Sequence, residues 1–314
     1  MVATAAWTVG IDLGRTKIAM GLIDPDGRIV ARRRIATQAE QGAQAVVARI
    51  AAEVESFGQD LPPGDAVQAV GICTPGPVDY AAGMILDVHE MVGLQQTPLR
   101  AMLADRLGVP VSLDHDAKSA AVGEFRSGAG RGHASMVYLV IGTGVGAAMI
   151  LDGQVLRGQR NLAGEVGHIT INRDGELCPC GSRGCVETYL SGPWLARRYI
   201  HRQIHIGQRL DPATVSGELV TARAQQGDPT ALQVLHEAGE ALGTAIATMA
   251  MILDIELYVI GGSVAKAGDL LLGPARVAIR TYAFPSVGPR VRIVASQMGD
   301  DAPILGCGWQ ALER

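Results

Sequence analysis

The sequence has no long, uninterrupted apolar run. The stretch "MVYLVIGTGVGAAMI" at 136–150 is broken by glycines and is shorter than the ~20 residues of a membrane-spanning helix. The amino-terminal "MVATAAWTVGIDLG" has no basic flank and carries Asp12 where an export signal would be apolar. We therefore expect a cytoplasmic protein without a membrane partner, in which the apolar runs form buried strands.

An excess of positive charge is also missing. The 27 lysines and arginines stand against 31 aspartates and glutamates, which gives a formal net charge of -4. This balance disfavours nucleic acid as a partner, because no basic stripe is available to follow a phosphate backbone. The run Arg32-Arg33-Arg34 ends an expected strand, where charged side chains usually mark a solvated sheet edge.

Cysteine is scarce and odd in number. The five cysteines argue against a disulfide framework in a chain without an export signal. Cys73 and Cys307 stand alone, so we expect them to be small core residues. The other three lie within "CPCGSRGC" at 178–185, ten residues or more after His168. Such a cluster can be a metal centre, a redox switch or a structural clamp, although its Cys-x-Cys spacing differs from the usual Cys-x-x-Cys of redox pairs.

The length and the apolar content suit two lobes. The chain has 314 residues, of which 48% are hydrophobic, and no low-complexity linker divides it. Asp26-Gly27 predicts a hairpin between two strands near the amino terminus. Helical periodicity predicts helices at 40–57, about 97–107, a tract from about 193 to 252, and about 265–283. Further strands are expected within 66–79, 108–114, 136–141, 255–263 and 290–296.

Three glycine loops follow expected strands. They are "DLGRTK" at 12–17, "GTGVG" at 142–146 and "VIGGS" at 259–263. Each alone is a weak signal, but together they are typical of backbone N–H groups and hydroxyls that face a polyphosphate. None fits the G-x-x-x-x-G-K-[ST] loop or the dinucleotide fingerprint, which disfavours a P-loop protein or a Rossmann dehydrogenase.

Asp116 stands where the strand "VPVSLD" gives way to the helix "AKSAAVGEF". A carboxylate in this position can cap the helix by accepting hydrogen bonds from its first N–H groups. It can also act as a general base that accepts the proton of a substrate hydroxyl as the oxygen attacks a phosphoryl group. The accompanying glycine loops favour the general base.

Several motifs share one order and spacing. They are "DLGRTK", "TPGPVD", "GTGVG", "AGEVGH" at 163–168, "CPCGSRGCVE" at 178–187 and "IGG" at 260–262. From Val9 to Gly306 the chain resembles the ROK family of sugar kinases and related repressors. The resemblance implies an α/β protein with the actin-like, ribonuclease-H-like ATPase fold, in which two α/β lobes flank an active-site cleft. We expect a small lobe at 1–115 plus about 298–314 and a large lobe at 116–297.

The resemblance also implies an activity and its residues. The expected reaction is the ATP-dependent phosphorylation of a primary hydroxyl of a hexose or hexose-like substrate, as in a glucokinase, with Asp116 as the base. Mg²⁺ would arrive with ATP, and the family implies a homodimer. The other expected contacts are Asp12, Gly14, Thr16, Lys17, Gly142, Thr143 and Gly144 with phosphates, Gly261 and Gly262 with adenosine, and Glu165, His168 and Glu187 with the sugar.

The cysteine cluster then predicts zinc. Zinc takes tetrahedral sulfur and nitrogen ligands, and His168, Cys178, Cys180 and Cys185 supply four, so no position stays open for water. A closed site is structural. We expect it to hold the loop that carries Glu165 and Glu187, because hydroxyl recognition needs carboxylates in fixed places. His168 could present its second ring nitrogen to the sugar.

The chain departs from the family pattern in three places. Arg15 stands where the family commonly has glycine, and we expect a turn that tolerates negative φ there. His115 replaces an asparagine before the base, and "HEMVGLQ" at 89–95 has Glu90 and Leu94 near an expected Asn and Trp. Those asparagines usually touch the sugar, so Glu90 and His115 become candidate substrate contacts. Either the loop has drifted, or the substrate is another hexose, an amino sugar or a C7-cyclitol.

The family's repressors offer a competing function. They resemble this chain preceded by a helix-turn-helix segment, whereas here the first phosphate strand begins near Trp7 and the net charge is acidic. A sugar-binding module without catalysis would be expected to lack the base or the glycine loops. We therefore expect an enzyme.

Overall fold

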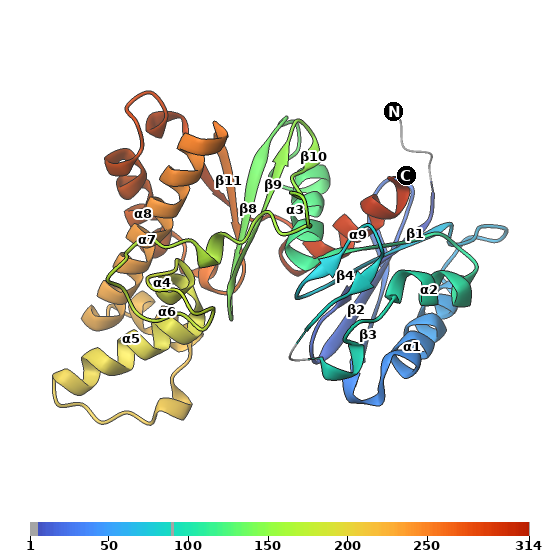
Figure 1. Ribbon diagram of the computed structural model, residues 1–314, viewed down its shortest axis with the longest axis horizontal. Helices are drawn as coiled ribbons and strands as arrows, with labels where there is room; N and C mark the ends of the chain where they lie inside the picture. Colours follow the sequence, from blue (N-terminus) through green and yellow to red (C-terminus); the bar gives the residue numbers. More distant parts are fainter. Residues whose placement is uncertain (1–5, 89–90, 314) are drawn as a thin grey trace. The chain divides into compact units, whose positions relative to one another are not determined.

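The computed structural model describes residues 6–88 and 91–313, and the chain divides into two compact units (Figure 1). The first unit comprises residues up to His133, Met149–Ala163 and those from Gln297 onward, and the second comprises Ala134–Ala148 and Gly164–Ser296. The described residues include two five-stranded sheets with helices, so the α/β class is confirmed. The units differ from the expected lobes because residues 116–133 and 149–163 belong to the first unit.

The first unit is built on a sheet whose strand order is β3-β2-β1-β4-β7. Its strands are β1 (Thr8–Leu13), β2 (Lys17–Ile23), β3 (Ile29–Ala36), β4 (Ala69–Thr74) and β7 (Val111–His115). The hairpin expected at Asp26-Gly27 joins β2 to β3, and Gly27 adopts a φ of 81°. Strands β1, β4 and β7 are parallel, so their carboxyl ends meet at one edge of the sheet.

Arginines mark the outer strand of this sheet. Residues of β3 alternate between half-buried and exposed, as expected for a strand that is paired on one side only. Arg32 pairs with Asp301 at 2.7 Å and Arg33 with Asp60 at 2.6 Å. The basic run is thus a solvated edge that is paired with carboxylates.

The two faces of the first sheet are covered differently. Ile11 and Ile72 point into an apolar core with α1 (Ala43–Ser56) and α2 (Leu99–Leu107), whose buried residues recur at helical spacing. The opposite face bears Gly10 and Gly71, and the carboxy-terminal helix α9 (Ala302–Leu312) lies on it. Alternation along a strand therefore separates a side-chain core from a backbone contact.

Glycines allow α9 to approach its neighbours very closely. A Cβ at Gly10 would lie 1.9 Å from the Ile304 carbonyl oxygen, and a Cβ at Gly71 would lie 1.9 Å from the Cys307 oxygen. On the other side of α9, a Cβ at Gly306 would lie 1.7 Å from the Ser119 oxygen in α3 (Asp116–Ser127). Helix α9 is therefore fixed against β1, β4 and α3 at backbone distance.

The second sheet has the order β10-β9-β8-β11-β12. Its strands are β8 (Met136–Ile141), β9 (Val145–Leu151), β10 (Gln154–Val155), β11 (Leu257–Gly261) and β12 (Arg292–Ala295). Strand β10 and the end of β9 belong to the first unit by their contacts, and the rest of this sheet belongs to the second. The helical tract divides into α5 (Gly192–His205), α6 (Gly217–Gln225) and α7 (Pro229–Leu253), with α8 (Asp269–Tyr282) after β11. Helices α5 and α6 each end shortly before a glycine of positive φ, Gly207 at 83° and Gly227 at 87°. Pro229 is the first residue of α7, where the N–H that proline lacks has no partner within the helix.

In the part of the chain that the structure describes, none of the helices has both the length and the apolarity that crossing a membrane requires.

Gly306→Ala should destabilise the protein strongly. The new methyl group would collide with the backbone of α3, which cannot move aside as a flexible side chain could. We therefore expect the free energy of unfolding to fall by about 3 kcal/mol or more, at the upper end of overpacking costs. Gly273→Ala in α8 is the matched control, because its Cβ meets nothing within 4 Å and alanine is the better helix former by about 1 kcal/mol. Urea unfolding measures both changes; equal stability of the two variants would contradict this packing.

Candidate active site

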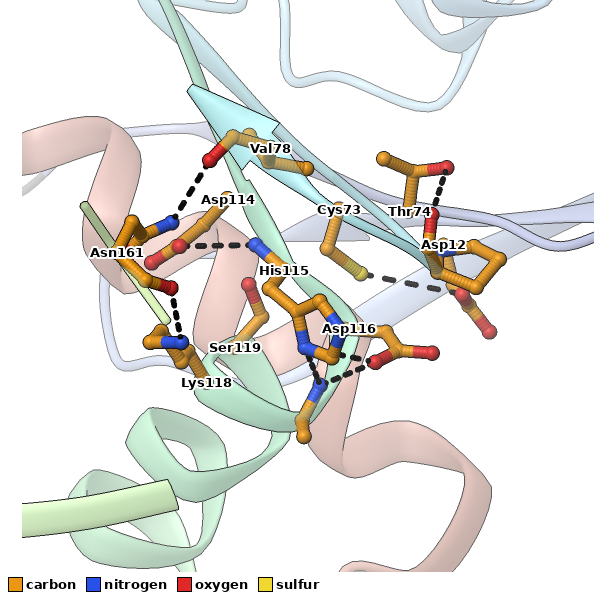
Figure 2. Close-up of polar contacts among 12 residues, drawn as sticks. Asp12, Cys73, Thr74, Val78, Asp114, His115, Asp116, Lys118, Ser119 and Asn161 are labelled. Carbon is orange, nitrogen blue, oxygen red and sulfur yellow. Dashed lines mark hydrogen bonds and ion pairs between the residues drawn. The ribbon is translucent and has the colours of Figure 1, made fainter. Parts of the chain in front are cut away.

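Polar side chains gather at the carboxyl ends of the parallel strands in the first unit (Figure 2). In register across β1, β4 and β7 lie Asp12, Cys73 and Asp114, and His115 pairs with Thr74 one step later. In parallel strands, residues in register share a face, and this is the face that α9 covers. The row ends where α3 begins, at Asp116.

His115 rather than Asp116 is the N-cap of α3. The ring atom Nδ1 of His115 accepts a hydrogen bond from the backbone N–H of Ala117 at 3.2 Å. The backbone N–H of His115 donates to Asp114 Oδ1 at 2.8 Å. The sequence missed this role because histidine is not among the common capping residues.

Asp116 is the first residue of α3 and is reachable from solvent. Its side chain is 40% exposed, and Oδ1 lies 2.5 Å from the Ala117 nitrogen and 3.1 Å from His115 Nδ1. One carboxylate oxygen is therefore held by the helix end. This leaves Oδ2 as an acceptor at the end of a rigid strand-to-helix junction.

Asp12 carries a destabilised negative charge. Burial, followed by the nearby charge of Asp116, raises the pKa of Asp12 from its ordinary 3.8 to about 6, against a smaller opposing effect of Lys17. The Cys73 thiol donates to Asp12 Oδ1 at 3.8 Å (Figure 2). Two carboxylates with little compensating positive charge make this edge a place where a cation would be stabilised.

A buried network behind the site was missed by the sequence analysis. Asp114, which is 1% exposed, accepts from Arg157 Nη1 at 2.8 Å and from Gln310 Nε2 at 2.6 Å. Arg157 also lies over the ring of Tyr80, 3.5 Å from its centroid. The strand end that carries His115 is thus held by partners 43 and 196 residues away in sequence, which no local pattern reveals.

Asn161 connects the same network to the helix. Its side chain donates to the Val78 carbonyl at 3.3 Å and accepts from Arg157 at 3.2 Å, and its carbonyl accepts from Lys118 Nζ at 2.9 Å. It does so with a φ of 58°, a left-handed conformation that asparagine tolerates better than most residues. Residues 157–161 are thereby tied to α3 and to the loop after β4.

The first glycine loop is closed by backbone hydrogen bonds. The Gly14 N–H donates to the Lys17 carbonyl at 3.0 Å, and Thr37 Oγ1 donates to the Gly14 carbonyl at 2.7 Å. Arg15 is exposed and does not adopt positive φ. The turn therefore forms without the glycine that is common at this position, and Thr16 and Lys17 are exposed beside it.

The other two glycine loops lie in the second unit. Loop 142–146 is tied to Glu187, whose Oε2 accepts from the Val145 N–H at 3.0 Å, and the Gly192 N–H donates to the Gly142 carbonyl at 2.8 Å. At the end of β11, Gly262 has a φ of 89°, and its Cβ would lie 2.3 Å from the Ile141 carbonyl oxygen. Glycine is thus required where β11 passes the strand that leads into loop 142–146.

Four side chains form a metal-sized cluster. The ligand atoms of His168, Cys178, Cys180 and Cys185 all lie within 4.8 Å of one another. Cys180 and Cys185 have sulfurs 3.7 Å apart, and Cys178 Sγ lies 3.8 Å from His168 Nδ1. Two sulfurs at about 2.3 Å from a tetrahedral zinc would be about 3.7–3.8 Å apart, so the donor set and the spacing fit zinc. The thiols are free, without a disulfide between them.

The cluster lies beside both expected sugar-binding carboxylates. His168 closes a short helical turn in which its N–H donates to the Glu165 carbonyl at 3.1 Å. Glu187 follows Cys185 by two residues and begins α4 (Glu187–Leu190). Burial raises the pKa of the Cys185 thiol to about 12, and its hydrogen bonds with the thiols of Cys180 and Cys178 add to this effect.

Arg198 of α5 holds the same segment from outside. Its guanidinium pairs with Glu176 at 3.1 Å, donates to the Thr188 carbonyl at 3.2 Å and lies over the Tyr189 ring at 4.4 Å. Glu176 precedes the cysteines and Thr188 follows them, so one side chain joins the two ends of the loop. No sequence motif indicated this contact.

The expected site residues fall into two groups. The first unit holds Asp12, Gly14, Thr16, Lys17, His115 and Asp116. The second unit holds Gly142, Thr143, Gly144, Glu165, His168, Glu187, Gly261, Gly262 and the three cysteines. Glu90 lies outside the described residues, and Leu94 is buried in the core of the first unit.

Comparisons with known proteins agree with one another over the whole chain. The model of the ROK family matches residues 8–314. A glucokinase of Thermotoga maritima is 32% identical over 98% of this chain and 97% of its own. An N-acetylmannosamine kinase of Shigella boydii is 33% identical over 97% and 98%. The crystal structure of a Streptomyces griseus ROK glucokinase in complex with glucose and AMPPNP is 33% identical, covers 98% of this chain and 100% of its own, and superposes with a TM-score of 0.81.

Asp12→Asn should stabilise the free protein at neutral pH. The folded protein keeps the Asp12 proton up to a pKa of about 6, whereas an unfolded chain releases it near 3.8, so stability falls as pH rises between these values. We expect the variant to gain at most about 3 kcal/mol above pH 6 and progressively less toward pH 4.

Thermal unfolding between pH 4.5 and 7.5, without nucleotide or Mg²⁺, measures this difference. Asp26→Asn is the control, because Asp26 lies in an exposed turn with a side chain that is 72% exposed. A wild-type protein that is more stable than Asp12→Asn at pH 7.5 would show that the Asp12 charge is compensated.

Proposed function

The chain is a member of the ROK family and an ATP-dependent sugar kinase, and we propose that it phosphorylates a primary hydroxyl of a hexose-like substrate with Asp116 as the general base. The observation that carries the proposal is the position of Asp116. It is an exposed carboxylate at the carboxyl end of a parallel strand, it begins a helix, and Asp12 lies close enough to interact with it electrostatically.

In this proposal Asp116 accepts the proton of the substrate hydroxyl as the oxygen attacks the terminal phosphoryl group of ATP. Asp114 and the N-cap of α3 position the base, because they fix the backbone on both sides of it. Asp12 would hold Mg²⁺, which supplies positive charge against the phosphates. The raised pKa of Asp12 supports this role, because it shows that the ionised carboxylate is unfavourable in this environment and would be stabilised by a cation.

We further propose that the preferred substrate is not glucose but another hexose-like compound, such as an amino sugar or a C7-cyclitol. The donor and acceptor roles of the His115 ring nitrogens depend on its tautomer, whereas an asparagine amide always offers both a donor and an acceptor. Glu90, which the motif resemblance alone places at the substrate, would add a negatively charged hydrogen-bond acceptor. A carboxylate is the natural partner of a ligand ammonium group.

The cysteine cluster is proposed as a structural zinc site. Its four ligands complete a tetrahedron, which leaves no position for a reacting water. His168 would use Nδ1 for the metal, so that Nε2 remains for the substrate. The zinc and Arg198 would then hold Glu165 and Glu187 from two sides.

Asp116→Asn should lower kcat by ~10² or more, the usual contribution of a general base. Nucleotide binding and the unfolding temperature should stay near those of the wild type, because Oδ1 can still accept from Ala117. A coupled ADP-release assay measures kcat, and Asp105→Asn, an exposed residue of α2, is the control. A variant that keeps its rate but melts much earlier would make Asp116 a structural residue only.

His115→Asn should move substrate preference toward glucose. One mismatched buried polar group costs ~1 to 3 kcal/mol, so the ratio of kcat/KM for glucose to that for the best substrate should rise by about tenfold or more. The measurement is a screen of hexoses, amino sugars and cyclitols with both proteins, and His236→Asn on α7 serves as control. If wild-type protein uses glucose at least as efficiently as every other compound, the substrate proposal fails.

Cys180→Ser should lose zinc and weaken sugar binding. Elemental analysis of the wild type should give about one zinc per chain, and the variant should give much less, with a raised KM for the sugar because Glu165 and Glu187 are no longer held. Cys73→Ser, outside the cluster, should keep its zinc. Normal activity in a zinc-free preparation would rule out the proposed role.

A further inference from the structure

Two histidines of α5 lie one helical turn apart, away from every residue assigned above. His201 and His205 are both exposed, and their Nε2 atoms are 3.3 Å apart. Their rings meet edge to face, with centroids 4.4 Å apart and an interplanar angle of 80°. The two ring nitrogens thus lie at hydrogen-bonding distance from each other, near the carboxyl end of the helix (α5 in Figure 1).

This separation is the one that a metal ion requires. With metal–nitrogen bonds of about 2.0–2.1 Å and tetrahedral angles, two imidazole nitrogens lie about 3.3 Å apart. The i, i+4 spacing places both rings on the same face of a helix, as in the two histidines of helical zinc motifs. A small rotation of either exposed ring can direct both lone pairs at a shared ion.

The neighbouring positive charges are partly neutralised. Arg202, next to His201 in sequence, pairs with both carboxylate oxygens of Glu237 at 2.6 Å. Glu176 pairs with both Arg197, at 3.7 Å, and Arg198, at 3.1 Å. Three guanidinium groups thus share two carboxylates, and the bonds from the imidazoles to a cation would have to outweigh the remaining positive charge.

The surroundings leave room for further ligands. His201, but not His205, lines a hollow of about 850 Å³ in the second unit, whose other lining residues include Glu176, three arginines and the apolar side chains of Ile204 and Val215. Water can complete the coordination of an ion on this side. Two protein ligands with open positions make a reversible site, unlike the closed cluster of three thiols and an imidazole.

We propose that His201 and His205 form a second metal site, which chelates a divalent transition metal of the class that imidazole prefers, namely Cu²⁺, Ni²⁺ or Zn²⁺. The site shares no ligand with the cysteine cluster. Arg198 of the same helix contacts the cysteine segment, so an ion on the last turns of α5 would stiffen the helix that holds the loop. The inference is independent of the kinase reaction.

The test is a titration of untagged protein, with zinc retained in the cysteine cluster, by Ni²⁺ at pH 7.5 in isothermal calorimetry. We expect one Ni²⁺ per chain in addition to the retained zinc. His201→Ala and His205→Ala should each weaken this binding by at least about tenfold, since losing even an outer-shell partner costs 10–100-fold. Both residues are exposed, so circular dichroism should report unchanged folding. His236→Ala is the matched control, an exposed histidine one turn before Glu240.

A second readout identifies the ligands. The electron paramagnetic resonance spectrum of one added Cu²⁺ should show two coordinated nitrogens in the wild type and His236→Ala, and one in either α5 variant. Nickel binding that is unchanged in both α5 variants, or equally weakened in His236→Ala, would overturn the proposal. So would the absence of any nickel binding by the wild-type protein.

Discussion

The backbone contact of α9 with β1, β4 and α3 is the constraint on which the first unit depends. The contact depends on Gly10, Gly71 and Gly306. At each of these positions the backbones lie so close together that even the Cβ of an alanine would not fit between them. That contact fixes the face on which Asp12, Cys73 and Asp114 lie in register. Gln310 of α9 donates a hydrogen bond to Asp114, so the strand end that precedes Asp116 is held by the carboxy-terminal helix.

The carboxylates Asp12 and Asp114 of the candidate site have different electrostatic environments. Asp12 is half-buried near Asp116, and its desolvation and the charge of Asp116 together raise the pKa of Asp12. The buried Asp114, in contrast, has an arginine and an amide as partners. This difference supports the proposal that Asp114 positions the strand end and that Asp12 binds a cation.

The second unit uses two different devices to shape a loop of mostly irregular backbone. The ligand atoms of His168 and three cysteines meet inside the loop, where the proposed zinc would hold it, and Arg198 joins its two ends from outside. Both sets of contacts involve the segment between Glu165, in irregular backbone, and Glu187, the first residue of α4. The pair His201 and His205 lies further along the helix that bears Arg198, which would connect any ion bound there to the same segment.

The sequence alone determined the elements whose cause is local. The Asp26-Gly27 hairpin, the strands that end in glycine loops, and the four clustered ligands all follow from neighbouring residues, and the shared motifs indicated the family. Tertiary structure alone decided that His115 caps α3, that Asp114 is buried against Arg157, and that α9 is the helix covering the site. These features depend on residues far apart in the chain and on a short packing distance that glycines allow because they have no side chain. A local stretch of sequence therefore cannot predict them.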